Sequence, residues 1–181
     1  MNRFMIVVNP DKDTDSTVTN RIQSYLEAHG AACMVRDVFH LEFSDWEALK
    51  KEQFDCVLVL GGDGTLLRMA GETEDIDIPL FGINLGTVGF LTEGEVANIE
   101  EILDRLLTDD FTIEERMMVT GTVTKADGTT YRKSALNDIV ISRAGFSRLI
   151  GLNVSVDGQV LDTYEADGVV ISTPTGSTGY N

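Results

Sequence analysis

Short apolar runs alternate with helical repeats through the first half of the chain. Continuous apolar stretches predict buried strands at Phe4–Val8, Ala31–Val35, Cys56–Leu60 and Pro79–Asn84. Between them, apolar residues recur at spacings of three and four, which indicates helices after Ser16, around Trp46 and from Leu66. Apolar strands that alternate with helices predict a parallel sheet covered by helices on both faces.

A further helix is expected between Ile99 and Leu107, where apolar residues form a complete stripe at spacings of three and four. Asn98 stands where a helix N-cap belongs, and Glu101 is placed to bond back to it in a capping box. The sequence therefore predicts that a capped, amphipathic helix ends the first half.

The second half has the pattern of antiparallel strands. Two pairs, Asp127-Gly128 and Asp157-Gly158, each lie between β-rich segments, which is a strong signal of a β-hairpin. We therefore expect an α/β protein in two domains. A Rossmann-like parallel sheet with helices spans 1–111, and an incomplete antiparallel β-sandwich domain spans 112–181.

The last residues have the composition of a loop that opens a further element. Val169–Ser172 is typical of a strand, Thr173–Tyr180 is rich in glycine and hydroxyl side chains, and Asn181 follows. A β layer that ends in such a turn has nothing to cover its last edge. We expect the sequence to be a fragment or a shortened form of a longer protein.

Composition and charge narrow the class of protein. Of the 181 residues, 43% are apolar and 24% are charged, as in ordinary folded domains. The 14 basic and 30 acidic residues give a net charge of −16, which disfavours nucleic acid and anionic membranes as partners. No apolar run approaches the roughly 20 residues that span a bilayer, and the N-terminus lacks the pattern of a signal peptide. We expect a cytoplasmic protein.

The cysteines, Cys33 and Cys56, both lie in apolar strand-like runs. We expect reduced, buried thiols, with a redox or metal-binding pair as the alternative. Because His29 and His40 are the only histidines, a zinc site is disfavoured, and no residue is assigned to a resident metal.

The first candidate for chemistry is Gly61-Gly62-Asp63-Gly64-Thr65, where a predicted strand meets a predicted helix. Ligands of open α/β sheets bind at the carboxyl ends of strands, and glycines there let backbone N–H groups approach phosphate oxygens. Asp63 would repel phosphates unless its carboxylate accepts a proton from an attacking hydroxyl or contacts Mg²⁺ carried with a nucleotide. The structural alternative is a tight turn in which Asp63 caps the helix.

A second glycine-rich segment, Gly82–Leu91, also follows a predicted strand. Asn84 is suited to bind a sugar or phosphate, and Phe90 is suited to lie against a base. An ordinary structural loop is the alternative.

Two further motifs lie in the β-rich half. Asn137-Asp138 interrupts an apolar strand, and it either forms a turn or binds ribose hydroxyls or an adenine amine. Asp167, between Ala166 and Gly168, is followed by Thr173–Tyr180, whose hydroxyls around glycines suit a sugar or phosphate.

Together and in this order, these four motifs resemble the ATP- or polyphosphate-dependent NAD kinase family, from the first strand to the last residue. The Gly-Gly-Asp-Gly turn alone is shared with lipid kinases of the diacylglycerol type and with phosphofructokinases. The resemblance implies a nucleotide-binding α/β domain, a β-sandwich domain and NAD held between them. It also implies transfer of the γ-phosphoryl group of ATP to the 2′-hydroxyl of the adenosine ribose of NAD, and a homo-oligomer, dimer or tetramer, of the full-length protein.

The resemblance assigns roles to residues of this sequence. It implies that Asp63 accepts the proton of the 2′-hydroxyl, that Asn137 and Asp138 bind the dinucleotide, and that Asp167 reaches NAD, in some members from a neighbouring subunit. The further ligand contacts that it implies are Gly64, Arg68, Arg148, Thr178, Tyr180 and Asn181. The motifs themselves add Gly61, Gly62, Thr65, Thr175 and Gly179. For the two arginines, a solvated surface position is the alternative.

The sequence departs from the family pattern at several positions. Asp138 stands where the family usually has Glu, so its carboxylate is one methylene shorter. Gly179 replaces a usual Ala, and Glu165 stands where a basic residue is common. Members of the family also continue beyond the equivalent of residue 181.

We expect phosphoryl transfer by positioning. Asp63 accepts or orients the hydroxyl proton, the Gly61–Gly64 turn with Mg²⁺ neutralises the triphosphate, and the β domain fixes the adenosine through Asn137, Asp138 and Thr178. One alternative is a lipid kinase, against which the net charge of −16 argues. The other is a non-catalytic NAD-binding remnant, which the short length and Glu165 favour.

Overall fold

A computed structural model describes residues 1–51, 54–86, 89–145 and 148–179. The chain separates into an N-terminal unit, Met1–Glu115, and a C-terminal unit, Arg116–Asn181. Within the described ranges, every helix is too short or too polar to cross a lipid bilayer.

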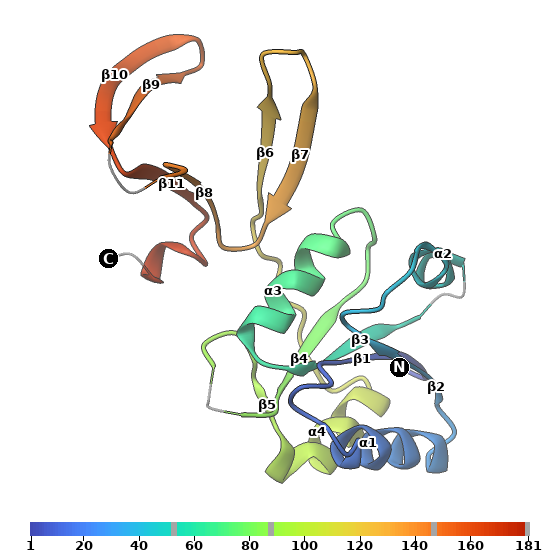
Figure 1. Cartoon of the computed structure of the whole chain (residues 1–181). Coiled ribbons are helices and arrows are strands. Elements are labelled where there is room, and N and C mark those ends of the chain that lie inside the picture. The colour runs from blue at the N-terminus through green and yellow to red at the C-terminus, as the bar shows by residue number, and fades with distance from the viewer. Residues whose placement is uncertain (52–53, 87–88, 146–147, 180–181) are drawn as a thin grey trace. The chain divides into compact units, whose positions relative to one another are not determined.

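The N-terminal unit is built on a five-stranded parallel sheet in the order β2-β1-β3-β4-β5 (Figure 1). Its strands are β1 (Arg3–Val8), β2 (Ala32–Asp37), β3 (Cys56–Gly61), β4 (Leu80–Asn84) and β5 (Gly94–Glu95). The first four were predicted from their apolar runs, whereas β5 is too short to leave a pattern. Because β1 lies between β2 and β3, the strand order reverses there, and the crevice outside their carboxyl ends is the usual ligand site of such sheets.

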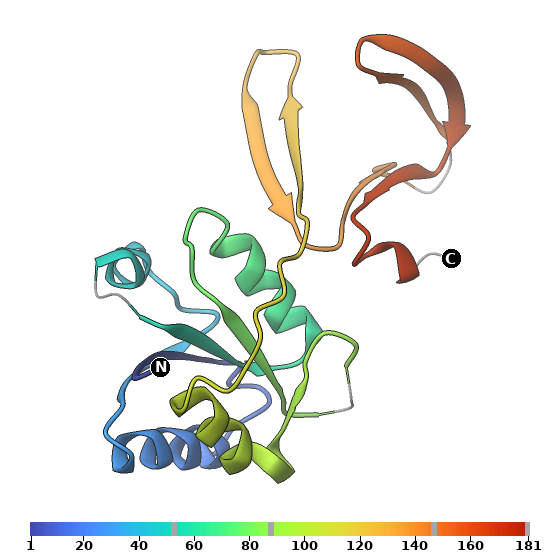
Figure 2. The same ribbon diagram turned by 180° about the vertical axis from the view of Figure 1, so that it is seen from behind.

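Helices cover both faces of this sheet (Figures 1 and 2). They are α1 (Thr17–Ala28), α2 (Phe43–Lys51), α3 (Asp63–Glu72) and α4 (Ile99–Leu107). Successive side chains of β1 point to opposite faces. Phe4 and Ile6 therefore pack in one core with residues of α1 and α4, and Met5 and Val7 pack in a second core with residues of α2 and α3. The predicted fold, a parallel sheet between helices, is confirmed.

The helix α4 begins where the sequence predicts, but the capping prediction is wrong. Asn98 precedes the helix and its side chain makes no capping hydrogen bond. It is the last residue of a 3₁₀ turn, Val96–Asn98, and its backbone (φ −115°, ψ 25°) is not in the extended conformation that places a cap over the first N–H groups. The helix is held instead by the buried side chains of Ile99, Leu103 and Leu106.

The C-terminal unit is antiparallel, as the sequence pattern predicts, and its described strands form three pairs, of which the pattern predicts the two hairpins. They are β6 (Val119–Thr124) with β7 (Thr130–Ala135), β8 (Asp138–Ser142) with β11 (Gly168–Ser172), and β9 (Ile150–Val156) with β10 (Gln159–Ala166). Both Asp-Gly pairs connect hairpins, and Asp157 and Gly158 have the positive φ angles (51° and 78°) of a tight hairpin turn. Of the described apolar side chains in this unit, Leu136 is the one that is buried. Its strands are therefore held mainly by backbone pairing.

Candidate active site

Asp63 is the first residue of α3 and directly follows β3. The N–H groups of Thr65 and Leu66 donate to the carbonyl of Gly62 rather than to the carboxylate of Asp63, so the alternative in which Asp63 caps its own helix is wrong. Instead, Oδ2 accepts the N–H of Phe90 (2.7 Å), and Oδ1 accepts the N–H groups of Leu91 (3.1 Å) and Thr92 (3.1 Å) and the hydroxyl of Thr92 (3.2 Å). These bonds tie the carboxylate to the segment that follows β4, the neighbour of β3 in the sheet.

The hydrogen bonds set the charge state of Asp63. Partial burial alone would raise the pKa of this carboxyl group, because it disfavours the charged form. The three backbone N–H groups and the hydroxyl of Thr92 outweigh that effect and hold the pKa of Asp63 below its ordinary value. The carboxylate is therefore ionised, and fixed in orientation, at neutral pH.

Gly89 is what allows this close approach. A β-carbon built on Gly89 would lie 2.7 Å from Cγ of Asp63 and 2.7 Å from Oγ1 of Thr92. Both separations are shorter than any normal contact, so a side chain at position 89 would displace the carboxylate or the loop. This glycine gives a physical role to the second glycine-rich segment, which sequence reasoning could not separate from an ordinary loop.

The loop after β1 reaches the same turn. The backbone N–H of Asn9 donates to the carbonyl of Leu60 (2.8 Å), and Nδ2 of Asn9 donates to Oγ1 of Thr65 (3.5 Å). Nζ of Lys12 lies 2.7 Å from the position of a β-carbon built on Gly62. Sequence reasoning missed Asn9 and Lys12. The signal that could have found them is their place directly after the first apolar strand, at the carboxyl edge of the sheet.

The other predicted residues of the N-terminal unit lie around this turn in different ways. Asn84 is buried and its Oδ1 accepts the N–H of Gly86 (3.0 Å), so it shapes its own loop. Phe90 is 74% exposed, and Gly64 is exposed with open space around it. Arg68 lies with its guanidinium 5.6 Å from the ring centre of Phe39, about 140° around the helix from Asp63.

In the C-terminal unit, the described part of the final turn, Thr173–Gly179, packs directly on Asn137. The backbone N–H of Thr173 donates to the carbonyl of Asn137 (2.8 Å), and the hydroxyl of Ser172 donates to the same carbonyl (3.2 Å). A β-carbon built on Gly176 would lie 2.7 Å from Cα of Asn137. The structure therefore brings together two motifs that are almost 40 residues apart in the sequence.

Asn137 carries an unused acceptor. Its Oδ1 is buried and has no hydrogen-bond partner among the described residues. An acceptor that is buried without a partner costs about 1–3 kcal/mol, so a donor from outside the chain would stabilise it. Asp138 follows as the first residue of β8 and is half-buried.

The hydroxyls of the final turn are partly engaged with their own segment. The hydroxyl of Thr178 donates to the carbonyl of Thr175 (3.4 Å), and a guanidinium nitrogen of Arg116 donates to the hydroxyl of Thr175 (3.5 Å). Thr178 and Gly179 are exposed. The predicted contacts Tyr180 and Asn181 lie outside the described residues.

Asp167 forms an ion pair with Arg143, whose Nε lies 2.8 Å from Oδ1 of the carboxylate. The backbone N–H of Arg143 also donates to the carbonyl of Asp167 (2.9 Å), so the two residues hold each other. Sequence reasoning did not single out Arg143. Arg148 is exposed, which agrees both with a ligand contact and with a solvated surface position.

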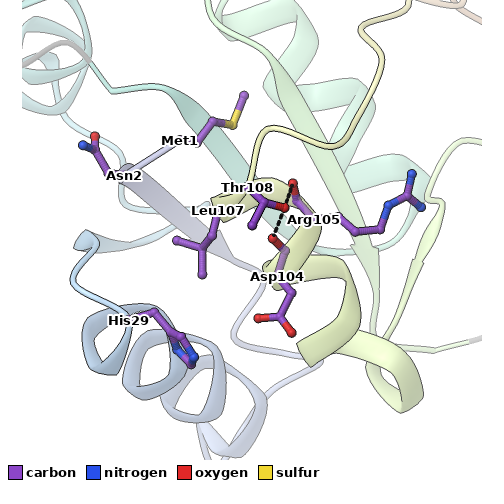
Figure 3. Close-up of a pocket in the computed structure, with 7 residues that line it drawn as sticks. All are labelled: Met1, Asn2, His29, Asp104, Arg105, Leu107 and Thr108. Atoms are coloured by element: carbon purple, nitrogen blue, oxygen red, sulfur yellow. Dashed lines mark hydrogen bonds between the residues drawn. The ribbon is translucent and has the colours of Figure 1, made fainter.

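A pocket of about 490 Å³ lies near the amino end of β1 (Figure 3). It is lined by Met1, Asn2, His29, Asp104, Arg105, Leu107 and Thr108. Met1 and Asn2 precede β1, so this pocket is at the amino end of the strand, whereas the Asp63 turn is at the carboxyl ends. The hydroxyl of Thr108 donates to the carbonyl of Asp104 (2.8 Å), as expected at a helix end. This pocket is therefore not the candidate active site.

Comparison with known proteins identifies the family. Residues 4–111 match the model of the ATP-NAD kinase N-terminal domain, and residues 136–181 match the model of the ATP-NAD kinase C-terminal domain. The chain belongs to the NAD kinase family. The resemblance predicted from the four motifs is thus confirmed, and neither the lipid kinase nor the non-catalytic alternative is supported by these matches.

Individual NAD kinases match the whole chain. It is 43% identical to the NAD kinase of Lachnoclostridium phytofermentans, over all of this chain and 65% of that protein. It is 40% identical to the NAD kinase of Lachnospira eligens, over all of this chain and 64% of that protein. The chain thus spans about 65% of the length of the curated relatives that it matches.

A solved structure shares the fold. The crystal structure of yeast NADH kinase complexed with NADH matches with a TM-score of 0.79 and 23% identity. The match covers 99% of this chain and 60% of the yeast chain. It supports the two-part α/β and antiparallel β architecture of this NAD kinase family member.

Proposed function

We propose that the protein carrying this sequence is a kinase, a phosphotransferase that phosphorylates the 2′-hydroxyl of the adenosine ribose of NAD to give NADP, with ATP or polyphosphate as donor. The observation that carries the proposal is the carboxylate of Asp63, which is ionised and fixed by four hydrogen bonds where β3 ends. The names of its relatives support NAD as the substrate.

The proposed role of Asp63 is to orient the 2′-hydroxyl and to accept its proton as the phosphoryl group arrives. A carboxylate of lowered pKa is a weak base, so it is poorly suited to remove the proton early. Phosphoryl transfer passes through a loose transition state in which the attacking oxygen needs little activation. Positioning of that oxygen by a fixed carboxylate is therefore the larger contribution.

The proposed adenosine site uses Asn137, Asp138 and Thr178, with Asp167 held by Arg143. Support comes from the buried Oδ1 of Asn137, without a partner among the described residues, which an adenine amine or a ribose hydroxyl would satisfy. The remaining proposed contacts are Gly61, Gly62, Gly64, Thr65, Arg68, Asn84, Phe90, Arg148, Thr175, Gly179, Tyr180 and Asn181.

The proposed metal is Mg²⁺ that arrives with the donor. Among the described residues, no three His, Cys, Asp or Glu side chains gather as a metal site. Mg²⁺ in kinases is commonly held by one or two carboxylates and the substrate phosphates. Oδ2 of Asp63 accepts the N–H of Phe90 and retains a second lone pair for this purpose. When bound, the ion would neutralise charge on the phosphates.

The remaining proposals concern the setting of the reaction. The two free cysteines support a reducing compartment, the cytoplasm, as the place of action. We also propose that the full-length protein is a dimer or tetramer, and that its nucleotide-binding domain is 1–111, which the family match over 4–111 supports.

A product assay tests the proposal. The whole protein is incubated with Mg²⁺, NAD and diacylglycerol together, in parallel with ATP and with polyphosphate as donor. We expect NADP as the phosphorylated product and no phosphatidic acid. Phosphatidic acid, or NAD that stays unmodified with both donors, would contradict the proposed function.

A further inference from the structure

The side chain of Lys12 lies over the glycine turn that precedes Asp63. Its Nζ is 2.7 Å from a β-carbon built on Gly62 and 3.7 Å from one built on Gly86. The ammonium group is therefore next to the backbone of two glycines, one after β3 and one after β4, although Lys12 itself follows β1. Three loops meet at this point, where the strand order reverses.

Lys12 has no partner in the part of the chain that the structure describes. No carboxylate there forms an ion pair with it, although the sequence has 30 acidic and only 14 basic residues. Its backbone is held in a turn, because its N–H donates to the carbonyl of Asn9 (3.0 Å). The neighbouring carboxylate of Asp13 is occupied at the start of α1, where it accepts the N–H groups of Val18 (3.1 Å) and Thr19 (2.8 Å).

The groups around the ammonium suit a phosphate. Glycines at 62 and 86 leave backbone exposed on either side of it, and the first N–H groups of α3 lie in the same turn without helical partners. The carboxylate of Asp63 accepts the N–H groups of Phe90, Leu91 and Thr92 and forms no ion pair with Lys12 among the described residues. The turn thus holds the carboxylate of Asp63 against one neighbouring loop, while the ammonium group of Lys12 approaches it from another.

We infer that Lys12 is a binding residue for the phosphate chain of the donor. The inference rests on the proposed function and deepens it. Asp63 orients the hydroxyl that is phosphorylated, and Lys12 binds the phosphate chain that supplies the phosphoryl group. Lysine binds phosphate as a point charge, and no similar charge is provided by the Gly61–Gly64 turn itself. The alternative ligand of Lys12 is the pyrophosphate group of NAD, which has the same phosphate chemistry.

Kinetics of the whole protein separate the two sources. We expect Lys12→Met to raise the KM for ATP about 10- to 100-fold, as loss of a charge-assisted hydrogen bond does, with the KM for NAD changed less than about twofold. Lys12→Arg keeps the charge and should restore most of the donor affinity. Lys50→Met is the matched control, because Lys50 is exposed near the end of α2, towards the amino end of β3.

A binding measurement keeps the test independent of NAD phosphorylation. Calorimetric titration with tripolyphosphate and with ATP should show binding to the parent and to Lys50→Met, and weakened binding to Lys12→Met. If the parent makes no NADP yet shows this pattern, the proposed function fails and the donor site stands. An unchanged KM for ATP in Lys12→Met, a rise in the KM for NAD instead, or no binding of either probe to the parent would overturn the inference.

Discussion

The carboxylate of Asp63 occupies the space that a side chain at Gly89 would need, with Cγ 2.7 Å from the position of the missing β-carbon. Two glycine-rich segments, one after β3 and one after β4, are therefore a single arrangement. One supplies the carboxylate, and the other supplies the N–H groups that hold it. The orientation of Asp63 depends on a residue 26 positions away.

The first prediction concerns Gly89→Ala. The new methyl group would push against Asp63 and Thr92, so we expect kcat to fall at least about tenfold and stability to fall by about 1–3 kcal/mol. Steady-state kinetics and urea unfolding of the whole protein measure the two effects. Gly64→Ala is the control for stability alone, because nothing lies within 4 Å of its β-carbon position. Equal kcat in Gly89→Ala and the parent would show that the close approach at Gly89 is not needed for turnover.

The second prediction concerns Gly176→Ala. A methyl group there would lie 2.7 Å from Cα of Asn137, so it would displace the segment that carries the buried amide oxygen. We expect the KM for NAD to rise at least about tenfold, while the KM for ATP changes little. Gly151→Ala, at an open position in β9, is the matched control and should resemble the parent. A normal KM for NAD in Gly176→Ala would remove Asn137 from the proposed adenosine site.

Much of the fold follows from the sequence, because its signals are local. Uninterrupted apolar runs mark β1 and β3, and Asp157-Gly158 marks a hairpin by its own backbone preference. Two details could not be predicted in this way. The two residues of β5 pair with Ile83 and Asn84 of β4, and so short a strand leaves no pattern. Asn98 makes no side-chain cap because it ends a 3₁₀ turn. Both depend on the path of the backbone that precedes the residue, and a short sequence pattern does not contain this information.

The candidate site follows from the sequence less completely. The position of Asp63 at a strand end was predictable, whereas its bonding to Phe90–Thr92 depends on the order of strands in the sheet. The same is true of Lys12, which reaches Gly62 because β1 and β3 are neighbours, and of Arg143, which meets Asp167 because β8 pairs with β11. Contacts between segments far apart in sequence need the topology.

The third prediction concerns the thiols. Burial raises the pKa of Cys33 to about 11 and that of Cys56 to about 12, so we expect slow alkylation at a pH of about 7.5. Both residues are in register with Phe4, on opposite sides of β1. Two strand spacings, about 9.5 Å, separate them, which is too far for a disulfide.

Mass spectrometry of the folded protein after mild oxidation and iodoacetamide checks this. We expect no disulfide within the chain, slow labelling of half-buried Cys33 and slower labelling of buried Cys56. In denaturant, both thiols should be labelled rapidly. A disulfide within the native chain would contradict the sheet register.

The fourth prediction concerns the pH dependence of stability. The folded pKa of Asp63 is below its unfolded value of about 3.9, so its carboxylate stabilises the fold above that pH. This stabilisation is lost as the pH falls through the folded pKa. Asp63→Asn should therefore be less stable than the parent at about pH 7, and the difference should shrink below about pH 4. Urea unfolding across this range measures it, and a difference that stays constant or grows would contradict the hydrogen-bonded carboxylate.

If Asp63 acts on the hydroxyl that receives the phosphoryl group, its replacement should slow the reaction without weakening the binding of NAD. The direct measurement is the rate of NADP formation by Asp63→Asn in the whole protein, together with its affinity for NAD by calorimetry. We expect kcat to fall about 10²- to 10⁴-fold with NAD affinity nearly unchanged, while Asp75→Asn, at an exposed position, resembles the parent. Turnover of Asp63→Asn close to that of the parent would contradict the proposed role of this carboxylate.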